Sequence, residues 1–215
     1  MCGIFGCLGD GAPRAIIEGL KRLEYRGYDS VGYAVIKGKR VEVRKDKGRI
    51  SDFITSLDDS SLEGGVGIGH TRWATHGAPC KENAHPHTDC TGTVAVVHNG
   101  VLENFLQLRE ELLAKGHKFS SNTDTEIIPH VIEEGLKAGL GLKEAVADAL
   151  KRVAGSMAIA VLSSREPDRI VCARRDSPLV LGAGGSTPKA NDVVILCVRG
   201  RSVSLLRDAS QSHVC

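Results

Sequence analysis

The stretch MCGIFGCL (residues 1–8) places a cysteine at position 2, directly ahead of the apolar strand expected over Ile4–Leu8. Because the second residue is small, removal of Met1 would leave Cys2 with both a thiol and a free α-amino group. An α-amino group titrates near ~7.7–8.0, whereas an ordinary thiol is only a few per cent ionised at neutral pH. The amine can therefore serve as the general base for its own thiol. Position 2 alone is a weak signal, so the rest of the chain has to decide whether Cys2 is a nucleophile.

Beyond this strand, some segments of the chain have apolar residues at helical spacing and others have them at strand spacing. The expected strands are Ile4–Leu8, Val31–Ile36, Val66–His70, Thr93–His98, Ser156–Ser163, Arg169–Ala173 and Leu179–Gly182, with a hairpin partner strand around Val41 and Val43. The expected helices run from Pro13 to Gly27, from Glu103 to Lys115, from Asp124 to Leu136 with Thr123 as a candidate cap, and from Leu142 to Val153. Groups of strands that alternate with pairs of helices are typical of a fold in which packed sheets are covered by helices on the outside.

Composition narrows the class of protein. Of the 215 residues, 41% are apolar and 25% charged, which is typical of a folded globular chain. The net charge of +2 comes from 28 basic and 26 acidic residues in mixed order, so we expect no nucleic-acid partner. No apolar run approaches the ~20 residues of a membrane span, so we expect no membrane partner. The seven cysteines are odd in number and irregularly spaced, which favours reduced thiols and a cytoplasmic location.

Six motifs occur in order along the chain. They are CGIFG (2–6), EYRGYDS (24–30), GHTRWATHG (69–77), NAHPH (83–87), VVHNG (96–100) and SNTDTE (121–126). Together they closely resemble the glutaminase domain of class II glutamine amidotransferases, in the glucosamine-6-phosphate synthase (glutamine–fructose-6-phosphate aminotransferase, isomerizing) branch. They are less similar to the purine-pathway amidotransferase or to asparagine synthetase. The resemblance runs from Cys2 to about Gly182.

The resemblance implies a fold and an activity. The fold is the α+β, four-layer αββα sandwich of N-terminal-nucleophile hydrolases. The activity is hydrolysis of glutamine to glutamate and ammonia by Cys2, as the ammonia-supplying half of amino-sugar synthesis, with no cofactor and no metal.

The same resemblance implies roles for individual residues. Asn99, through its side-chain amide, and Gly100, through its backbone N–H, would stabilise the oxyanion. Arg72, Thr75 and His76 would hold the carboxylate of glutamine, and Asp124 would hold its ammonium group. Trp73 would lie where ammonia leaves, or would simply pack over the site.

Taken alone, these residues have plainer interpretations. Asn99-Gly100 would be a hairpin turn, Arg72 a surface ion pair and Asp124 a charge favoured at a helix start.

Two further alternatives stay open. Cys80, His85, His87 and Cys90 fall within eleven residues and offer the sulfur and nitrogen ligands of a structural zinc site, although not at a usual finger spacing. A non-catalytic zinc- or glutamine-binding module is therefore one alternative. The other is a glutaminase subunit of a different amidotransferase.

The end of the chain departs from the family pattern after Ser177-Pro178-Leu179. We expect residues 1–182 to form the glutaminase domain and residues 183–215 to be a divergent end. That end would be closing strands, over Val193–Val198 and Ser202–Leu206, or a truncated or frame-shifted tail. Nothing in the sequence corresponds to the sugar-phosphate isomerase part of the family. Fructose 6-phosphate would be reached only through a missing isomerase domain or a separate subunit, and the oligomeric state is not predicted.

Overall fold

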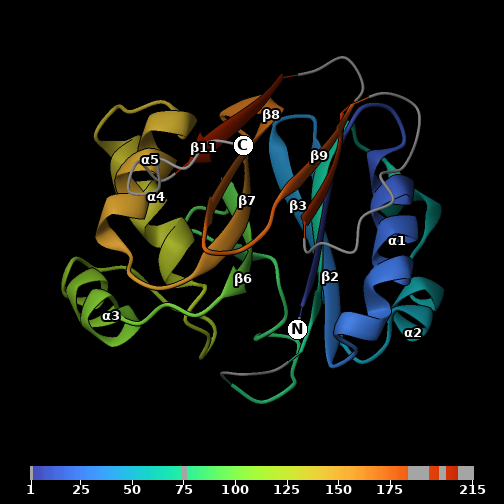
Figure 1. The fold of residues 1–215 in the computed structure, drawn as a ribbon, viewed down its shortest axis with the longest axis horizontal. Helices are drawn as coiled ribbons and strands as arrows, with labels where there is room; N and C mark the ends of the chain where they lie inside the picture. Colours follow the sequence, from blue (N-terminus) through green and yellow to red (C-terminus); the bar gives the residue numbers. More distant parts are fainter. Residues whose placement is uncertain (1, 74–76, 184–193, 199–201, 208–215) are drawn as a thin grey trace.

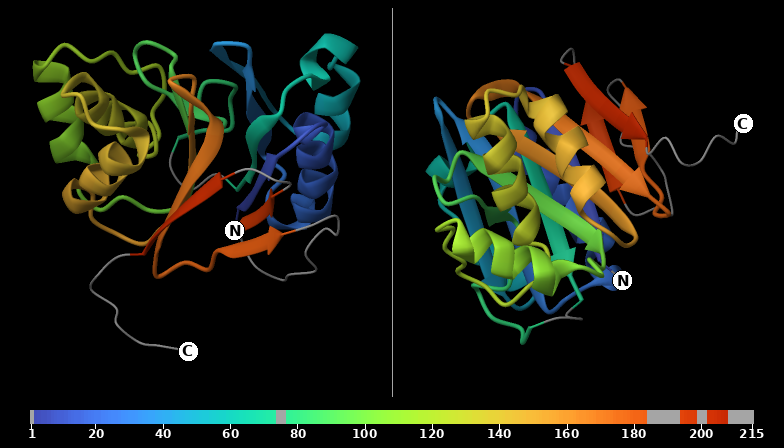
Figure 2. Two further views of the ribbon diagram at one scale, coloured as in Figure 1. Left: turned by 90° about the horizontal axis from the view of Figure 1, so that it is seen from above. Right: turned by 90° about the vertical axis from the view of Figure 1, so that its left-hand side faces the viewer.

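Two β-sheets lie face to face, with helices on both outer surfaces (Figures 1 and 2). The computed structural model describes residues 2–73, 77–183, 194–198 and 202–207. The six-stranded sheet has the order β3-β2-β4-β1-β10-β9 and the five-stranded sheet the order β11-β8-β7-β6-β5. The first comprises β1 (Gly3–Leu8), β2 (Ser30–Lys37), β3 (Arg40–Lys47), β4 (Val66–Arg72), β9 (Val180–Ala183) and β10 (Val194–Val198). The second comprises β5 (His87–Thr88), β6 (Val94–Gly100), β7 (Met157–Ser163), β8 (Glu166–Arg175) and β11 (Ser202–Arg207).

The helices divide between the two outer layers (Figure 1). The six-stranded sheet is covered by α1 (Ala12–Leu23) and α2 (Ile50–Thr55), with short 3-10 helices at Glu24–Arg26 and Asp59–Leu62. The five-stranded sheet is covered by α3 (Phe105–Ala114), α4 (Ile127–Lys137) and α5 (Leu142–Arg152). None of the helices in the described part of the chain has the length and apolar character that a membrane span requires.

Three apolar clusters fill the three interfaces between these layers. The first, with Phe5, Ile16 and Tyr33, lies between α1, α2 and the six-stranded sheet. The second, with Ile68 and Val97, lies between the two sheets. The third joins the five-stranded sheet to α3, α4 and α5 through side chains such as those of Leu112, Ile132, Val146 and Ile159. Both sheets are thus apolar on both faces, and the predicted four-layer αββα sandwich is confirmed.

The N-terminal strand occupies the middle of its sheet. β1 pairs antiparallel with β4, with Gly3 opposite Thr71, and parallel with β10 on its other side. This register places Cys2 beside the end of β4, where the GHTRWATHG motif continues. In the facing sheet, β6 pairs with β7 and ends at Gly100, so the VVHNG motif finishes at a strand end.

Most predicted elements are present, with small shifts at their ends. The expectation that Thr123 caps a helix starting at Asp124 is wrong, because α4 begins only at Ile127. Thr123 instead contacts the imidazole of His87, with 3.0 Å between Oγ1 and Nε2. The strands expected in the divergent end agree with β10 and β11, whereas the domain division between residues 182 and 183 stays a prediction.

Candidate active site

Cys2 lies against the backbone at the end of β4. The backbone N–H of Trp73 donates a hydrogen bond to Cys2 Sγ at 3.2 Å, and Sγ lies 3.6 Å from the Trp73 carbonyl oxygen. Burial raises the pKa of the Cys2 thiol, although the Trp73 N–H bond and the charge of Arg72 act in the opposite direction. A thiol with a raised pKa is largely protonated at neutral pH, so it needs a base in order to react.

Asn99 approaches Cys2 from the other sheet. Its Nδ2 donates to the Cys2 carbonyl oxygen at 3.2 Å, and its Oδ1 accepts a bond from His70 Nε2 at 2.9 Å. Because a carboxamide has two N–H groups, one remains for an oxygen bound beside Cys2. Asn99 and Gly100 therefore form the end of β6, not the hairpin turn that their sequence alone would suggest.

Gly100 has a backbone conformation that only glycine adopts readily. Its φ is +137°, and a Cβ at this position would collide with the carbonyl oxygen of Ser156. The strand end thus approaches its neighbour more closely than a side chain would allow. Gly100 itself is exposed, so the backbone next to Asn99 is open to a ligand.

Arg72 and Asp124 supply opposite charges to the same region. The Arg72 side chain is buried, and its Nη2 donates to the Gly77 carbonyl oxygen at 3.3 Å. Burial lowers the pKa of the guanidinium, while the negative charges of the Cys2 thiolate, when it forms, and of Asp124 act in the opposite direction. Asp124 is also buried, and its Oδ2 accepts the backbone N–H of Leu102 at 2.8 Å. Neither residue has the plain role of a surface ion pair or a helix-start charge.

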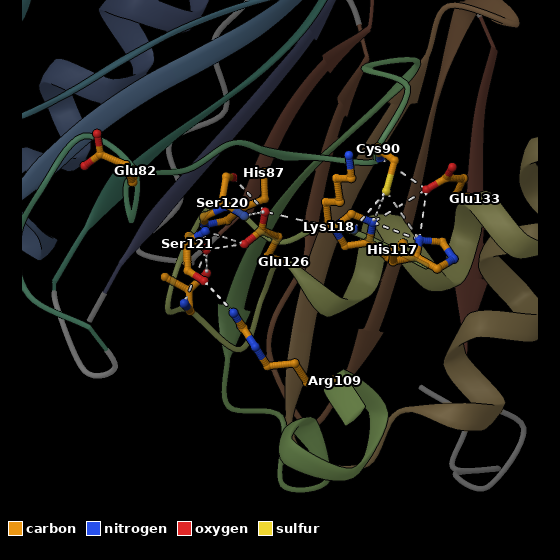
Figure 3. A network of polar contacts seen from close by, with 12 residues as sticks. Glu82, His87, Cys90, Arg109, His117, Lys118, Ser120, Ser121, Glu126 and Glu133 are labelled. Atoms are coloured by element: carbon orange, nitrogen blue, oxygen red, sulfur yellow. Dashed lines mark hydrogen bonds and ion pairs between the residues drawn. The ribbon is translucent and has the colours of Figure 1, made fainter. Parts of the chain in front are cut away.

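The segment that carries Asp124 is anchored by a neighbouring carboxylate (Figure 3). Glu126 accepts hydrogen bonds from the backbone N–H and the hydroxyl of both Ser120 and Ser121, at 2.6–2.8 Å. Burial acts to raise the pKa of Glu126, but the interaction with His130 and these serine bonds together hold it well below its usual range. A carboxylate bonded in this way stays ionised and fixes the backbone that precedes α4.

The remaining predicted residues are placed as follows. Thr75 and His76 lie outside the described residues. The Trp73 ring is 43% exposed and packs edge-on against Tyr28, with ring centroids 5.2 Å apart. This packing supports the plainer interpretation of Trp73, and its place on an ammonia exit stays a prediction.

His70 is a site residue to which sequence reasoning assigned no role. Its Nε2 faces two acceptors, Asn99 Oδ1 at 2.9 Å and the His98 carbonyl oxygen at 3.1 Å, so Nε2 carries the proton. A neutral His70 therefore orients the Asn99 amide so that its Nδ2 points toward Cys2. The available signal was the position of His70 inside GHTRWATHG, beside Arg72.

Four buried histidines around this site predict a loss of stability in acid. Burial lowers the pKa of His70 to about 3 and also lowers the pKa values of His85, His87 and His98. The unfolded chain takes up these protons near pH ~6.5, while the folded chain does not. The free energy of unfolding should therefore fall as the pH drops below that value, by roughly 1–2 kcal/mol per histidine between pH 7 and pH 5.

Urea unfolding at the two pH values measures this loss. His70→Gln keeps an N–H donor toward Asn99. In this variant the number of protons taken up on unfolding, which sets the pH dependence of the unfolding free energy, should be lower by about one. Equal unfolding free energies at pH 7 and pH 5 would contradict the prediction.

The zinc set suggested by spacing does not assemble. The ring of His85 lies against that of His70, with centroids 4.1 Å apart, and His87 contacts Thr123. Among the described residues, the one group with metal-ligand geometry contains Cys90 but none of Cys80, His85 and His87. The alternative of a zinc site made by these four residues is not supported, because the His85 and His87 side chains are buried in the core away from Cys90.

Comparison with known proteins decides the family. The model of a glutamine amidotransferase domain matches residues 70–185. The chain belongs to this family. The amidotransferase domain is 52% identical over 197 residues to the glutamine–fructose-6-phosphate aminotransferase [isomerizing] of Methanothermobacter thermautotrophicus, covering 90% of this chain and 33% of the relative. It is 48% identical over 216 residues to the enzyme of the same name from Pyrococcus horikoshii, covering 100% of this chain and 36% of the relative.

Solved structures agree at the level of the fold. The glutamine phosphoribosylpyrophosphate amidotransferase from B. subtilis, in complex with ADP and GMP, has a TM-score of 0.64 and 29% identity, covering 76% of this chain and 35% of that one. The higher identity to the aminotransferases confirms the branch indicated by the motifs. The amidotransferase domain spans about a third of the length of these curated relatives.

Proposed function

We propose that this amidotransferase domain hydrolyses glutamine to glutamate and ammonia, with Cys2 as the nucleophile once Met1 is removed. The observation that carries the proposal is the hydrogen bond from Asn99 Nδ2 to the Cys2 carbonyl oxygen, 3.2 Å long. It joins the N-terminus of one sheet to a strand end of the other. A nucleophile and a donor suited to an oxyanion therefore lie at one site.

The reaction would begin with proton transfer from the Cys2 thiol to its own α-amino group. The thiolate attacks the side-chain amide carbon of glutamine, and the carbonyl oxygen becomes an oxyanion. Asn99 Nδ2 and the backbone N–H of Gly100 donate to that oxygen. When the C–N bond breaks, the amine returns its proton to the leaving group, which departs as ammonia.

Water then completes the cycle. The amine accepts a proton from a water molecule, whose oxygen attacks the glutamyl thioester. The C–S bond breaks, glutamate is released and the thiol is regenerated. Held by the two charged groups on its α-carbon, the substrate stays in attack geometry throughout. Arg72, Thr75 and His76 would bind the α-carboxylate and Asp124 the α-ammonium group.

The ammonia acceptor is proposed from the relatives. Their name indicates fructose 6-phosphate, and about two thirds of their length lies beyond the matched region. We propose that residues 1–182 form the glutaminase domain, that residues 183–215 close its sheets, and that fructose 6-phosphate is reached through an isomerase part outside these 215 residues. The free thiols of Cys2, Cys7, Cys80, Cys90 and Cys172 support a cytoplasmic setting.

Labelling with a reactive glutamine analogue tests the proposal. A diazoketone or chloroketone analogue should modify one residue, Cys2, and the intact mass should show that Met1 is absent. Excess glutamine should slow the labelling, because both molecules occupy one site. Retention of Met1 in protein that releases glutamate, or labelling of a different residue, would refute the assignment of Cys2.

A further inference from the structure

Four potential metal ligands converge at the edge of the helical layer over the five-stranded sheet. Three of them, Cys90, His117 and Glu133, are labelled in Figure 3. Cys90 lies in the connection between β5 and β6, and His117 lies between α3 and α4. His130 and Glu133 lie three residues apart on α4 and so share one of its faces. His117, His130 and Glu133 are buried, and the thiol of Cys90 closes the cluster from the surface.

Five of the six distances between the four ligand atoms are close to the edges of a tetrahedral zinc site, and all four atoms lie within 4.8 Å of one another. His117 Nδ1 lies 3.2 Å from His130 Nδ1 and 3.2 Å from Glu133 Oε2, and His130 Nδ1 lies 3.5 Å from the same oxygen. Cys90 Sγ lies 3.6 Å from His117 Nδ1 and 3.5 Å from His130 Nδ1. Zinc bonds of about 2.0–2.1 Å to nitrogen or oxygen and about 2.3 Å to sulfur require edges of about 3.3 Å and 3.6 Å in a tetrahedral site.

Carboxylates face the outer nitrogens of both histidines, at distances longer than a hydrogen bond. His130 Nε2 faces Glu126 Oε1 at 4.0 Å, and His117 Nε2 faces Glu134 Oε1 at 3.9 Å. A histidine that ligates through one nitrogen commonly directs its other N–H at a carboxylate. The backbone N–H of Lys118 points at Cys90 Sγ, 3.4 Å away, a bond that favours a thiolate.

We propose that Cys90, His117, His130 and Glu133 bind one Zn²⁺ ion in a closed, four-coordinate structural site. A thiolate and a carboxylate together balance the charge of the ion, and the two imidazoles complete a ligand set suited to zinc. Four protein ligands leave no position for substrate, so the ion stabilises the fold and takes no part in glutamine hydrolysis. This replaces the expectation from sequence that the chain holds no metal.

The ion would join three segments of the chain. It ties the loop that leads into β6, the strand that carries Asn99, and the connection between α3 and α4 to α4 itself, which follows Asp124. Metal binding of this kind adds to folding stability, since the unfolded chain does not present the four ligands together. The inference does not depend on the proposed function, because none of the four ligands belongs to the glutaminase site.

Metal analysis tests the proposal directly. Untagged chain, purified without chelator and desalted, should contain about one zinc per molecule by elemental analysis. Cys90→Ser and His117→Ala should each reduce the zinc content at least about tenfold. Cys80→Ser, a cysteine outside the cluster, is the matched control and should keep the wild-type content. Far-UV circular dichroism verifies that each variant is folded.

Cobalt provides a second readout that does not depend on zinc carried through purification. Metal-free wild type loaded with Co²⁺ should show the intense visible bands of tetrahedral cobalt and a thiolate-to-cobalt charge-transfer band, and Cys90→Ser should lose the latter. Zinc should raise the melting temperature of wild type and Cys80→Ser, but not that of Cys90→Ser.

Three results would overturn the proposal. The first is folded wild type without metal that takes up none from equimolar Zn²⁺. The second is equal zinc in Cys90→Ser and Cys80→Ser. The third is another metal at full occupancy with the same ligand dependence, which would refute zinc as the ion.

Discussion

Cys2→Ala is expected to reduce glutamate release from glutamine by about 10⁴-fold or more, because no thioester can form without the sulfur. Glutamine binding, measured by calorimetry on the same protein, should change little, since Arg72 and Asp124 are untouched. The matched control is Cys80→Ser, which should keep wild-type turnover. Unchanged glutamate release in Cys2→Ala would refute the mechanism.

A second variant separates the thiol of Cys2 from its amine. Inserting an alanine between Met1 and Cys2 leaves the thiol in place but moves the free α-amino group one residue away. Because burial raises the pKa of the Cys2 thiol, the displaced base should cost about 10²–10⁴-fold in turnover. Wild-type turnover in this variant would show that another group accepts the thiol proton.

The layers of the fold could be predicted because strand and helix periodicities are strong along this chain. Ile16, Leu20 and Leu23 are buried on one face of α1, as their spacing indicates. Elements with weak periodicity could not be predicted. The six-residue helix α2 lies in a largely polar stretch, and only Ile50 and Phe53 are buried on it. The sequence predicts that α4 starts at Asp124, after a candidate cap at Thr123, which is three residues too early. The carboxylates of Asp124 and Glu126 bind backbone N–H groups of residues that precede the helix.

The site could be predicted in part, through motifs and not through geometry. Cys2 and Asn99 lie 97 positions apart in the sequence, and only the face-to-face packing of the two sheets brings them together. The orienting bond from His70 to Asn99 has the same origin, since the two residues come from β4 and β6. The Cys90 cluster was missed for a related reason. Its ligands come from three segments, and local spacing favoured His85 and His87, which are buried in the core.

Asn99→Ala is expected to lower kcat for glutamine by about 10²–10³-fold, with little change in KM. The oxyanion exists only in the transition state and the tetrahedral intermediate, so losing its donor affects turnover and not substrate binding. The matched control is Asn104→Ala. That amide bonds the backbone of Arg152 and Ala154, away from Cys2, so its loss should leave kcat near the wild-type value. A kcat for Asn99→Ala within about threefold of wild type would contradict the role.

A reaction without an oxyanion distinguishes two roles of Asn99. The same side chain also holds the Cys2 carbonyl oxygen, so Asn99→Ala could slow turnover merely by displacing the nucleophile. Alkylation of Cys2 by iodoacetamide needs a correctly placed, deprotonated thiol but develops no charge on a carbonyl oxygen. If Asn99 stabilises the oxyanion, its removal should leave the alkylation rate within about threefold of wild type while kcat falls by about 10²–10³-fold. If Asn99 only positions Cys2, both rates should fall together.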